Sequence, residues 1–420
     1  MADDLFHPWP NLLAMSCDEI LTAYRHSQLT DILSALDRLG RGKSTLIADI
    51  EILDRYFAAF PSEILQHRLQ LNVIQDLFRE LHDHVMKHPV WTHPVFRRFV
   101  DGQVTYDQLR IFAQHYFNQV KNTRQCVALA LGRFHSLLPY ATETPIGVIL
   151  SELTQMVLAR LLADEYGFAK QPSLTECDGI AGEDGIGMEI DALFKAVTHP
   201  ELYRRFLSAL GIVVSDYDVP LLHSVADNVL VQRIVSGDSE FDHLEALASV
   251  GLGMEWGVPA FFSMLMSGII KVFRNEGIPL DTRSMEIWSA HVQQDVLHGV
   301  AVMLVTSFFV ENRGDIERVK GITNALMAFR YEMMSDIYDE VFGGPCARID
   351  QIQLHSAYWL QDDRLKNKLL FARMGLRPLS VRDYSLYRSQ KRFPMITLAG
   401  SEEAKWNSGQ HVGVRLRDRT

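Results

Sequence analysis

The stretch Met285–Val310 reads MEIWSAHVQQDVLHGVAVMLVTSFFV, and it is the most informative part of this 420-residue chain. Apolar residues recur in it at three- and four-residue intervals, which is typical of a helix packed against other helices. His291, Asp295 and His298 stand at positions i, i+4 and i+7 of that helix. At about 100° per residue, these positions fall within roughly 60° of one another on one helix face.

These three side chains form a combination that transition metals favour. Two neutral imidazoles and a carboxylate suit Fe, Mn or Zn better than Mg or Ca, which prefer all-oxygen shells. The simpler alternative is a polar face on which His and Asp happen to recur. The almost wholly apolar run 299–310 opposes it, because a helix heading into the core would bury these groups without partners. A bound metal would remove that cost.

Helical periodicity dominates the rest of the chain as well. Alternating strand patterns are nearly absent, and the two weak candidates are 396–398 and 412–416. The sequence therefore predicts an all-α protein. Its expected helices are Leu71–Lys87, Tyr106–Leu138, Val148–Tyr166, Met188–Val197, Glu201–Leu210, Leu244–Phe273, Met285–Val310 and Asp315–Phe342.

The periodicity divides the chain into three parts. Residues 1–70 are expected to form a helical N-terminal extension, and residues 71–345 the main bundle. The segment 346–420 is less periodic and is interrupted by two prolines. It is therefore expected to wrap over the surface of the bundle.

Charge is unevenly distributed along the chain. The segment 364–420 holds 13 Lys and Arg against 4 Asp and Glu, a net charge of +9. Because the whole chain has a net charge of −11, residues 1–363 have a net charge of −20. A basic segment could bind nucleic acid, but no recognised nucleic-acid-binding motif accompanies it. Docking on the acidic remainder or on a partner subunit is the simpler prediction. We therefore expect no nucleic-acid partner. A homodimer is the expected assembly.

The expected location is the cytoplasm. The acidic start of the chain lacks a basic region followed by an apolar one, so no export signal is expected. The longest apolar run, 299–310, is too short to span a bilayer, so no membrane partner is expected. The four cysteines are scattered without a C-x-x-C pair and are expected to be free thiols in a reducing compartment.

Three ligands cannot complete a dinuclear metal site, so other helices should supply more. Glu165 ends an apolar helix just before a glycine, and Glu255 lies among apolar and aromatic neighbours, where a solvated carboxylate is not expected. Glu189 opens a short helix after a Gly-rich acidic loop, and His199 precedes a break at Pro200. Three of them have an ordinary alternative role. Glu165 would then be a surface acid in the last turn of its helix, Glu189 a first-turn acid favoured by the helix dipole, and His199 a turn residue.

The order of these motifs resembles the heme-oxygenase-like diiron oxidases. The motifs are L-x-x-D-E-Y-G at 161–167, H-P-E-L-Y-R-R-F-L-S-A-L-G at 199–211, G-M-E-W-x-x-P at 253–259 and H-x-x-x-D-x-x-H at 291–298. The segment His93–Tyr116 is similar to the opening helices of the wider superfamily, which includes pyrroloquinoline-quinone synthase and thiaminase-type proteins. The resemblance covers residues 75–345 and implies a heme-oxygenase-like helical bundle.

The resemblance also implies a ligand set. In that family two irons are held by an early Glu, a His, a middle Glu, and a final His, Asp and His. Members that resemble N-oxygenases have a further Glu about three turns before the first His, and Glu189 stands ten residues before His199. Because Pro200 disfavours helical geometry at His199, the helix is expected to be broken or distorted there. The implied ligands are Glu165, Glu189, His199, Glu255, His291, Asp295 and His298.

The implied cofactors are two Fe²⁺ ions, with O2 as cosubstrate. Two ferrous ions with open positions can reduce O2 and oxidise a small molecule held beside them. The additional Glu189 favours N-oxygenation of an amine or guanidine, on an amino-acid-like substrate of specialised metabolism. The alternative is C–H abstraction leading to desaturation, C–C cleavage or oxidative decarboxylation of an amino acid or fatty acid. Arg124, Arg133 and Arg204 are the candidates for holding a substrate carboxylate.

Other classes of protein fit these residues less well. Ferritin-like proteins use two Glu-x-x-His elements in a four-helix bundle, whereas Glu240–His243 falls in a polar, loop-like stretch. A heme-binding relative needs one axial histidine and leaves the larger set unexplained. A metal-free helical binding or scaffold protein is the second alternative, although such a protein would not need Glu255 in an apolar helix.

Overall fold

The structure is a computed structural model of the chain, and the residues it describes are 11–39, 70–134, 145–167, 197–349, 364–365 and 367–369. Of these residues, 81% are helical and none forms a strand, which confirms the all-α prediction. The two weak strand candidates, Glu189 and all but the last residue of the helix expected over 188–197 lie outside the described residues.

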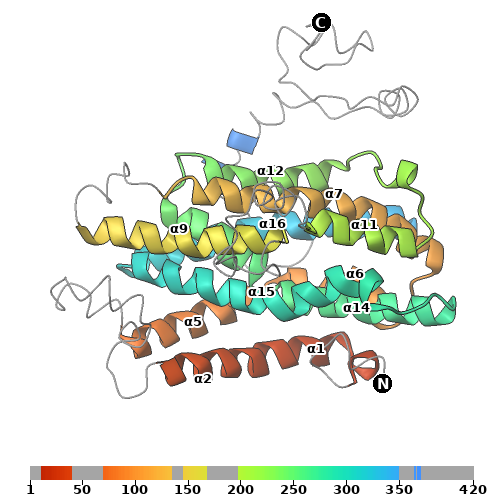
Figure 1. Cartoon of the computed structure of the whole chain (residues 1–420), viewed down its shortest axis with the longest axis horizontal. Helices are drawn as coiled ribbons and strands as arrows, with labels where there is room; N and C mark the ends of the chain where they lie inside the picture. The colour runs from red at the N-terminus through yellow and green to blue at the C-terminus, as the bar shows by residue number, and fades with distance from the viewer. Residues whose placement is uncertain are drawn as a thin grey trace, which may run out of the picture.

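The described N-terminal residues form a helical layer along one side of the bundle (Figure 1). This layer consists of α1 (Cys17–Ala23), the π-helical turn η3 (Tyr24–Gln28) and α2 (Leu29–Leu39), and it packs on α5 and α14. Ser16 and Glu19 begin α1 with a reciprocal capping box. The Tyr24 hydroxyl lies 2.8 Å from Ser263 Oγ, so the layer is hydrogen-bonded to the bundle as well as packed on it.

The bundle is built from long helices that lie side by side (Figure 1). Helix α15 contacts α9, α11, α14 and the π-helical segment η9, so it lies among the elements that carry the other candidate ligands. The helices are α5 (Leu71–Met86), α6 (Pro94–Val100), α7 (Tyr106–Leu131), α9 (Pro145–Glu165), α11 (His199–Ala209), α12 (His223–Gly237), α13 (His243–Ala248), η9 (Ser249–Glu255), α14 (Val258–Asn275), α15 (Thr282–Phe309) and α16 (Arg313–Phe342); short 3-10 turns occupy η2 (Leu12–Ala14), η5 (Pro89–Thr92) and η8 (Val214–Asp216).

One helix boundary and one whole helix differ from the sequence prediction. Helix α7 was expected to reach 138 but ends at Leu131, because Gly132 begins a turn after it. The Arg133 side chain then donates hydrogen bonds to the backbone carbonyls of Asp238 and Phe241. Helix α12 was not predicted at all. Its buried face carries Asn228 among other polar residues, so its apolar periodicity is weak.

The helix predicted over 244–273 is instead three elements in one continuous helical segment. Between α13 and α14, the π-helix η9 has the wider i→i+5 pattern, with the Trp256 amide 2.9 Å from the Gly251 carbonyl oxygen. Gly257 then lets the Trp91 ring lie against the start of α14, where a Cβ atom would clash with it. Glu255 is the last residue of η9, so the change of helix type falls at a candidate ligand.

Two helical segments, His243–Asn275 and Thr282–Phe309, are long and apolar enough by composition to cross a membrane. The prediction that the chain has no such segment considered only the run 299–310. In His243–Asn275, 89% of the most apolar window is buried inside the bundle. A core helix of a large bundle meets the same length and composition criterion, so burial in the bundle accounts for this hydropathy.

The described residues of the basic C-terminal segment contact the acidic body. Arg364 Nη2 lies 2.6 Å from Glu245 Oε1, which is a buried carboxylate at the start of α13. Lys368 Nζ lies 3.1 Å from Asp238 Oδ2 and 3.2 Å from Glu240 Oε1. At Arg364 and Lys368, these pairs agree with the first of the two expected docking surfaces, the acidic part of the same chain, rather than a partner subunit.

Candidate metal centre

Six of the seven predicted ligands lie in the described residues, and they form two groups of three. Within each group the potential ligand atoms lie within 4.8 Å of one another. The sequence places the three α15 residues on one helix face, but the structure distributes them over both groups. The first group is Glu165, His199 and His291, and the second group is Glu255, Asp295 and His298.

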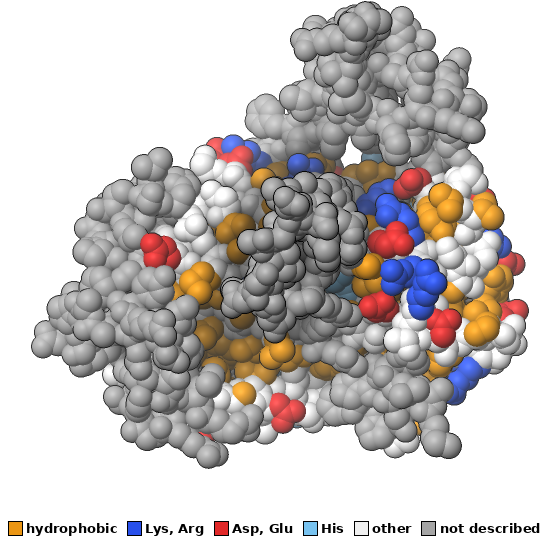
Figure 2. All heavy atoms as spheres, viewed as in Figure 1, with side chains coloured by type: hydrophobic (Ala, Val, Ile, Leu, Met, Phe, Trp, Pro, Cys, Tyr) orange, Lys and Arg blue, Asp and Glu red, His pale blue; other side chains and the backbone are white. Residues whose placement is uncertain are grey.

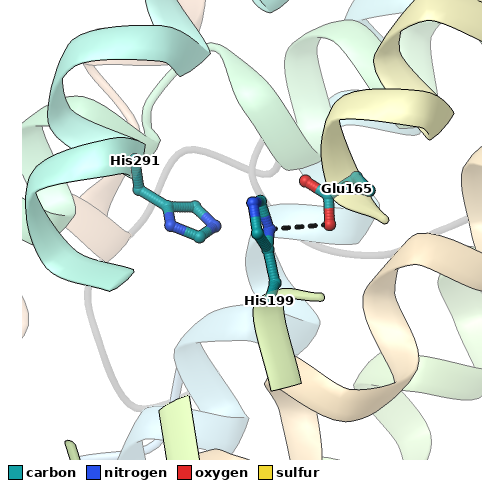
Figure 3. A group of neighbouring side chains, drawn as sticks. All are labelled: Glu165, His199 and His291. Atoms are coloured by element: carbon teal, nitrogen blue, oxygen red, sulfur yellow. Dashed lines mark ion pairs between the residues drawn. The ribbon is translucent and has the colours of Figure 1, made fainter. Parts of the chain in front are cut away.

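The first group joins the end of α9 to the start of α11 (Figure 3). Gly167 follows α9 with a φ of +78°, and a Cβ atom there would clash with the Val197 backbone. This close backbone approach, which only glycine permits, brings Glu165 beside His199. Thr198 caps α11, and His199 and Pro200 are its first two residues. The expected break at His199 is therefore the beginning of a helix, where proline is well tolerated.

Side chains of the first group point toward one another. His199 Nδ1 lies 2.9 Å from Glu165 Oε2, and the His199 and His291 ring centroids are 4.6 Å apart. His291 Nδ1 lies 2.7 Å from the Ile287 carbonyl oxygen, so this nitrogen carries the proton and Nε2 keeps its lone pair. The Phe262 ring stacks on the His291 imidazole at 4.5 Å and fixes its plane.

The second group is deeper in the bundle. Glu255 and Asp295 are 4% and 2% exposed. His298 Nδ1 lies 3.5 Å from Asp295 Oδ1 and 3.7 Å from Glu255 Oε2. Asp295 and His298 are one turn apart on α15, so a single helix sets their separation.

Asp164 contacts the second group without being one of its three potential ligands, and it was not among the residues predicted from the sequence. Its Oδ2 atom lies 2.9 Å from His298 Nε2. This contact places the proton of a neutral His298 on Nε2 and leaves the Nδ1 lone pair facing the two carboxylates. A carboxylate behind a histidine is the usual support of a metal-bound imidazole. The motif D-E at 164–165 carried the signal, but only the position of α15 shows which side chain each acid faces.

The pKa values of the ionisable side chains are shifted differently in the two groups. Burial alone would raise the pKa of the Glu165 carboxyl, but the His199 imidazole beside it lowers this pKa to about 2. Burial lowers the pKa of His291 to about 3, so this ring is neutral near pH 7. Burial and the neighbouring Glu255 raise the pKa of Asp295 well above its usual value. Burial opposes protonation of His298, but Asp295 and Glu255 raise its pKa to about 11.

The donor set fits two transition-metal ions. Nδ1 of His199 and Nδ1 of His298 are buried and form no hydrogen bond within the described residues, although carboxylate oxygens lie close to each. Adjacent ligands about 2.1 Å from one ion and 90–109° apart are about 3.0–3.4 Å from each other. The contacts of 2.9, 3.5 and 3.7 Å between these atoms are of that size. Mixed imidazole and carboxylate donors are typical of Fe, Mn and Zn.

A cavity of about 50 Å³ adjoins both groups. It is large enough for a few water molecules or for the reacting end of a small ligand. Its wall combines five of the ligands with apolar and polar side chains from α7, α14 and α16. The described residues that line it are Tyr116, Gln119, Val120, Thr123, Glu165, His199, Met254, Glu255, Val258, Phe262, His291, Asp295, Arg330 and Met333.

The structure places none of the three arginines predicted to hold a substrate carboxylate among these lining residues. Arg133 is bonded to backbone carbonyls, as described above. Arg124 lies over the Tyr166 ring, 5.0 Å from its centroid. Arg204 lies 3.7 Å from Glu201 on a surface over α11, where basic and acidic side chains alternate (Figure 2). Arg330, on α16, lines the cavity instead.

No protein-family model matches the chain, and no curated protein matches it.

Proposed function

We propose that this protein is a non-heme diiron oxygenase that uses O2 to oxidise a small amino-acid-like substrate. The observation that carries the proposal is the pair of buried three-ligand groups beside one cavity. Their residues are the six described positions at which the sequence resembles the heme-oxygenase-like diiron oxidases. We assign the chain to that family as part of the proposal.

Three protein ligands per ion favour a catalytic centre over a structural one. Structural zinc sites are closed by four protein ligands, whereas catalytic sites keep positions open for water or substrate. Each group here offers three described ligands, and five of the six line the cavity. Two ferrous ions held there would supply the reduction of O2 and the oxidation of the bound substrate.

The chain itself supplies fixed ligand positions and a partly apolar pocket. The Ile287 carbonyl and the Asp164 carboxylate fix the ring orientations of His291 and His298. Met254, Val258 and Phe262 belong to the apolar part of the wall. Exclusion of water protects a reactive oxidant from side reactions and strengthens electrostatic contacts inside the pocket.

The central experiment is metal analysis after anaerobic loading with Fe²⁺. Close to two irons per chain are expected, followed by O2 consumption when air is admitted. A maximum of one iron would indicate a mononuclear enzyme. Tight binding of zinc alone would contradict the proposed oxygen chemistry. Mass spectrometry against basic amino acids and fatty acids then identifies the oxidised product.

Glu255→Gln separates an oxygenase from a metal-free scaffold. In a scaffold, neutralising this buried carboxylate should change stability little or increase it. In a diiron oxygenase the variant should fold but lose iron-dependent O2 consumption. Glu245→Gln is the matched control: this buried carboxylate lies ten residues earlier and pairs with Arg364, away from the cavity. It should leave O2 consumption intact.

Glu189 decides between the two kinds of oxidation, and it lies outside the described residues. If it is a seventh ligand, as in relatives resembling N-oxygenases, Glu189→Ala should abolish N-oxygenation. A catalyst that Glu189→Ala leaves unchanged belongs with the six-ligand relatives that abstract hydrogen from carbon.

A further inference from the structure

Arg330 is an unusual residue of the cavity wall. It is 7% exposed, and it is the one Lys or Arg among the fully buried side chains of the described residues. It lies on α16 and faces the cavity together with Tyr116, Gln119 and the ligand Glu255. Burial lowers the pKa of its guanidinium, but the group stays charged at neutral pH.

The guanidinium has no fixed anionic partner. Within the described residues, it makes no hydrogen bond and no ion pair within 4.0 Å; it lies over the Phe261 ring, 5.9 Å from the centroid, and the Glu255 carboxylate acts on its pKa only from a greater distance. Arg348, which is partly buried, is paired: its Nη1 atom lies 2.6 Å from Asp336 Oδ1. A buried unpaired charge is destabilising, so folding alone gives no reason for arginine at position 330.

We propose that Arg330 binds the carboxylate of the substrate, and that the substrate is a short amino acid or carboxylic acid. The planar guanidinium can donate two parallel hydrogen bonds to a carboxylate, which fixes both position and orientation. The opposite end of the molecule then faces the two ligand groups. This inference deepens the proposed function and rests on it for the reaction, but carboxylate binding can be tested without metal.

The charge around the cavity supports an anionic group at this position. Two divalent ions and the three carboxylates of the described ligand groups leave one positive charge, and Arg330 adds a second. A purely cationic substrate would be repelled by Arg330, whereas an amino acid can place its carboxylate there and its amine or guanidine toward the metals.

The rest of the wall limits what the carboxylate can be attached to. Gln119 Nε2 lies 3.1 Å from Thr123 Oγ1, and Asn228 Nδ2 lies 2.9 Å from Gln119 Oε1, so one edge is a fixed polar network. The volume of about 50 Å³ accommodates only a few heavy atoms. A short polar chain suits this space better than the long chain of a fatty acid.

The test compares molecules that differ only in the carboxylate, using the metal-free full-length protein. The probes are glycine against methylamine, L-alanine against ethylamine, and L-serine against ethanolamine, each measured by thermal shift and calorimetry. The carboxylate members should bind the wild type at least about tenfold more tightly, the size expected for a charge-assisted hydrogen bond. Arg330→Gln should remove this difference, and Arg330→Lys should restore part of it. If no carboxylate in the set binds the wild type preferentially, the inference is overturned.

The ligand-free stability of Arg330→Met separates binding from a structural role. If Arg330 serves only to bind ligand, removal of the unpaired charge should leave Tm unchanged or raise it. A lowered Tm together with unchanged carboxylate preference in Arg330→Gln would show a structural role instead. Arg204→Gln is the matched control, because Arg204 is half exposed beside Glu201, and it should change neither measurement.

Iron content distinguishes failure of this inference from failure of the proposed function. Two irons per chain without Arg330-dependent carboxylate binding would overturn the inference alone. Arg330-dependent carboxylate binding in a protein that takes up no iron would support the inference and overturn the oxygenase. Arg330→Gln should load iron as the wild type does, since Arg330 belongs to neither ligand group.

Discussion

The two ligand groups are built from different kinds of structure. In the second group, Asp295 and His298 share one helix, and Glu255 ends a buried π-helix packed against that same helix. In the first group, three helices must meet, and two of the ligands, Glu165 and His199, stand at helix ends. The second group is therefore shaped by core packing, while the first depends on how the ends of α9 and α11 are joined. We expect two metal sites of unequal affinity, with the second group binding first.

The largest effect is expected from Asp295→Asn. A neutral amide is a weaker iron ligand than a carboxylate and no longer offsets the charge of the cations. Iron binding at the second group should fall by more than the roughly 10–100-fold that loss of an outer partner costs. Anaerobic iron titration measures this, with helicity by circular dichroism expected to stay unchanged.

Glu286→Gln is the control for that variant. Glu286 is also an acid on α15, but it pairs with Arg205 at 3.2 Å and belongs to neither ligand group. It should leave iron binding as in the wild type. Equal losses in the two variants would show that the ligand face of α15 has been assigned wrongly.

Glu165→Gln should halve the iron content and leave the second group occupied. Glu165 contributes to the first group only, and the three ligands of the second group come from η9 and α15. Elemental analysis should give close to one iron per chain. Loss of both ions would mean that the two groups cannot bind independently, which would remove the distinction between them.

Asp164→Ala tests the support behind His298. Without the carboxylate at 2.9 Å from Nε2, the ring loses its fixed orientation and tautomer. Affinity at the second group should fall about 10–100-fold, with the first group little changed. Glu152→Ala, an exposed acid earlier on α9, is the control and should have no effect. A selective loss at the first group instead would reverse the roles of the two clusters.

The affinity of the second group should also depend on pH, which is measured in Glu165→Gln so that only this group binds. The pKa of His298 in the metal-free protein is raised to about 11, so the ring is protonated near neutrality and a metal must displace that proton. Affinity should therefore be weakest at low pH and rise by about tenfold per pH unit through the neutral range. Calorimetry in buffers of different ionisation enthalpy should detect at least one proton released. An affinity that is flat between pH 6 and 8 would contradict this electrostatic description.

The helix that carries His291, Asp295 and His298 and their common face could be predicted from the sequence, because spacing on one helix is a local property. The separation of His291 from Asp295 and His298 into two groups could not, since it depends on which neighbouring element approaches each turn. Arg330 was missed for the same reason. It occurs in an ordinary amphipathic pattern, and only the packing of α16 shows that its charge is buried at the cavity.

The helix boundaries show the same limit. The apolar spacing after Leu131 continues the pattern of α7, but Gly132 and the bonds made by Arg133 end the helix. Helix α12 escaped prediction because its buried face includes Asp227, Asn228 and Gln232. Those side chains face partners on other helices, and a single sequence does not show the partners.

The π-helix η9 makes the centre sensitive to chain length in a way that its ligand residues do not reveal. Each i→i+5 turn accommodates one more residue than an α-helical turn, and η9 ends at Glu255. Deletion of a single residue there would allow the segment to rewind as α-helix. The flanking helices α13 and α14 would keep their register, but residues within η9 would change position relative to them. The Glu255 carboxylate would then be displaced from Asp295 and His298 although no ligand had been replaced. A one-codon deletion in η9 should thus disturb the proposed metal centre while preserving the packing of the flanking helices.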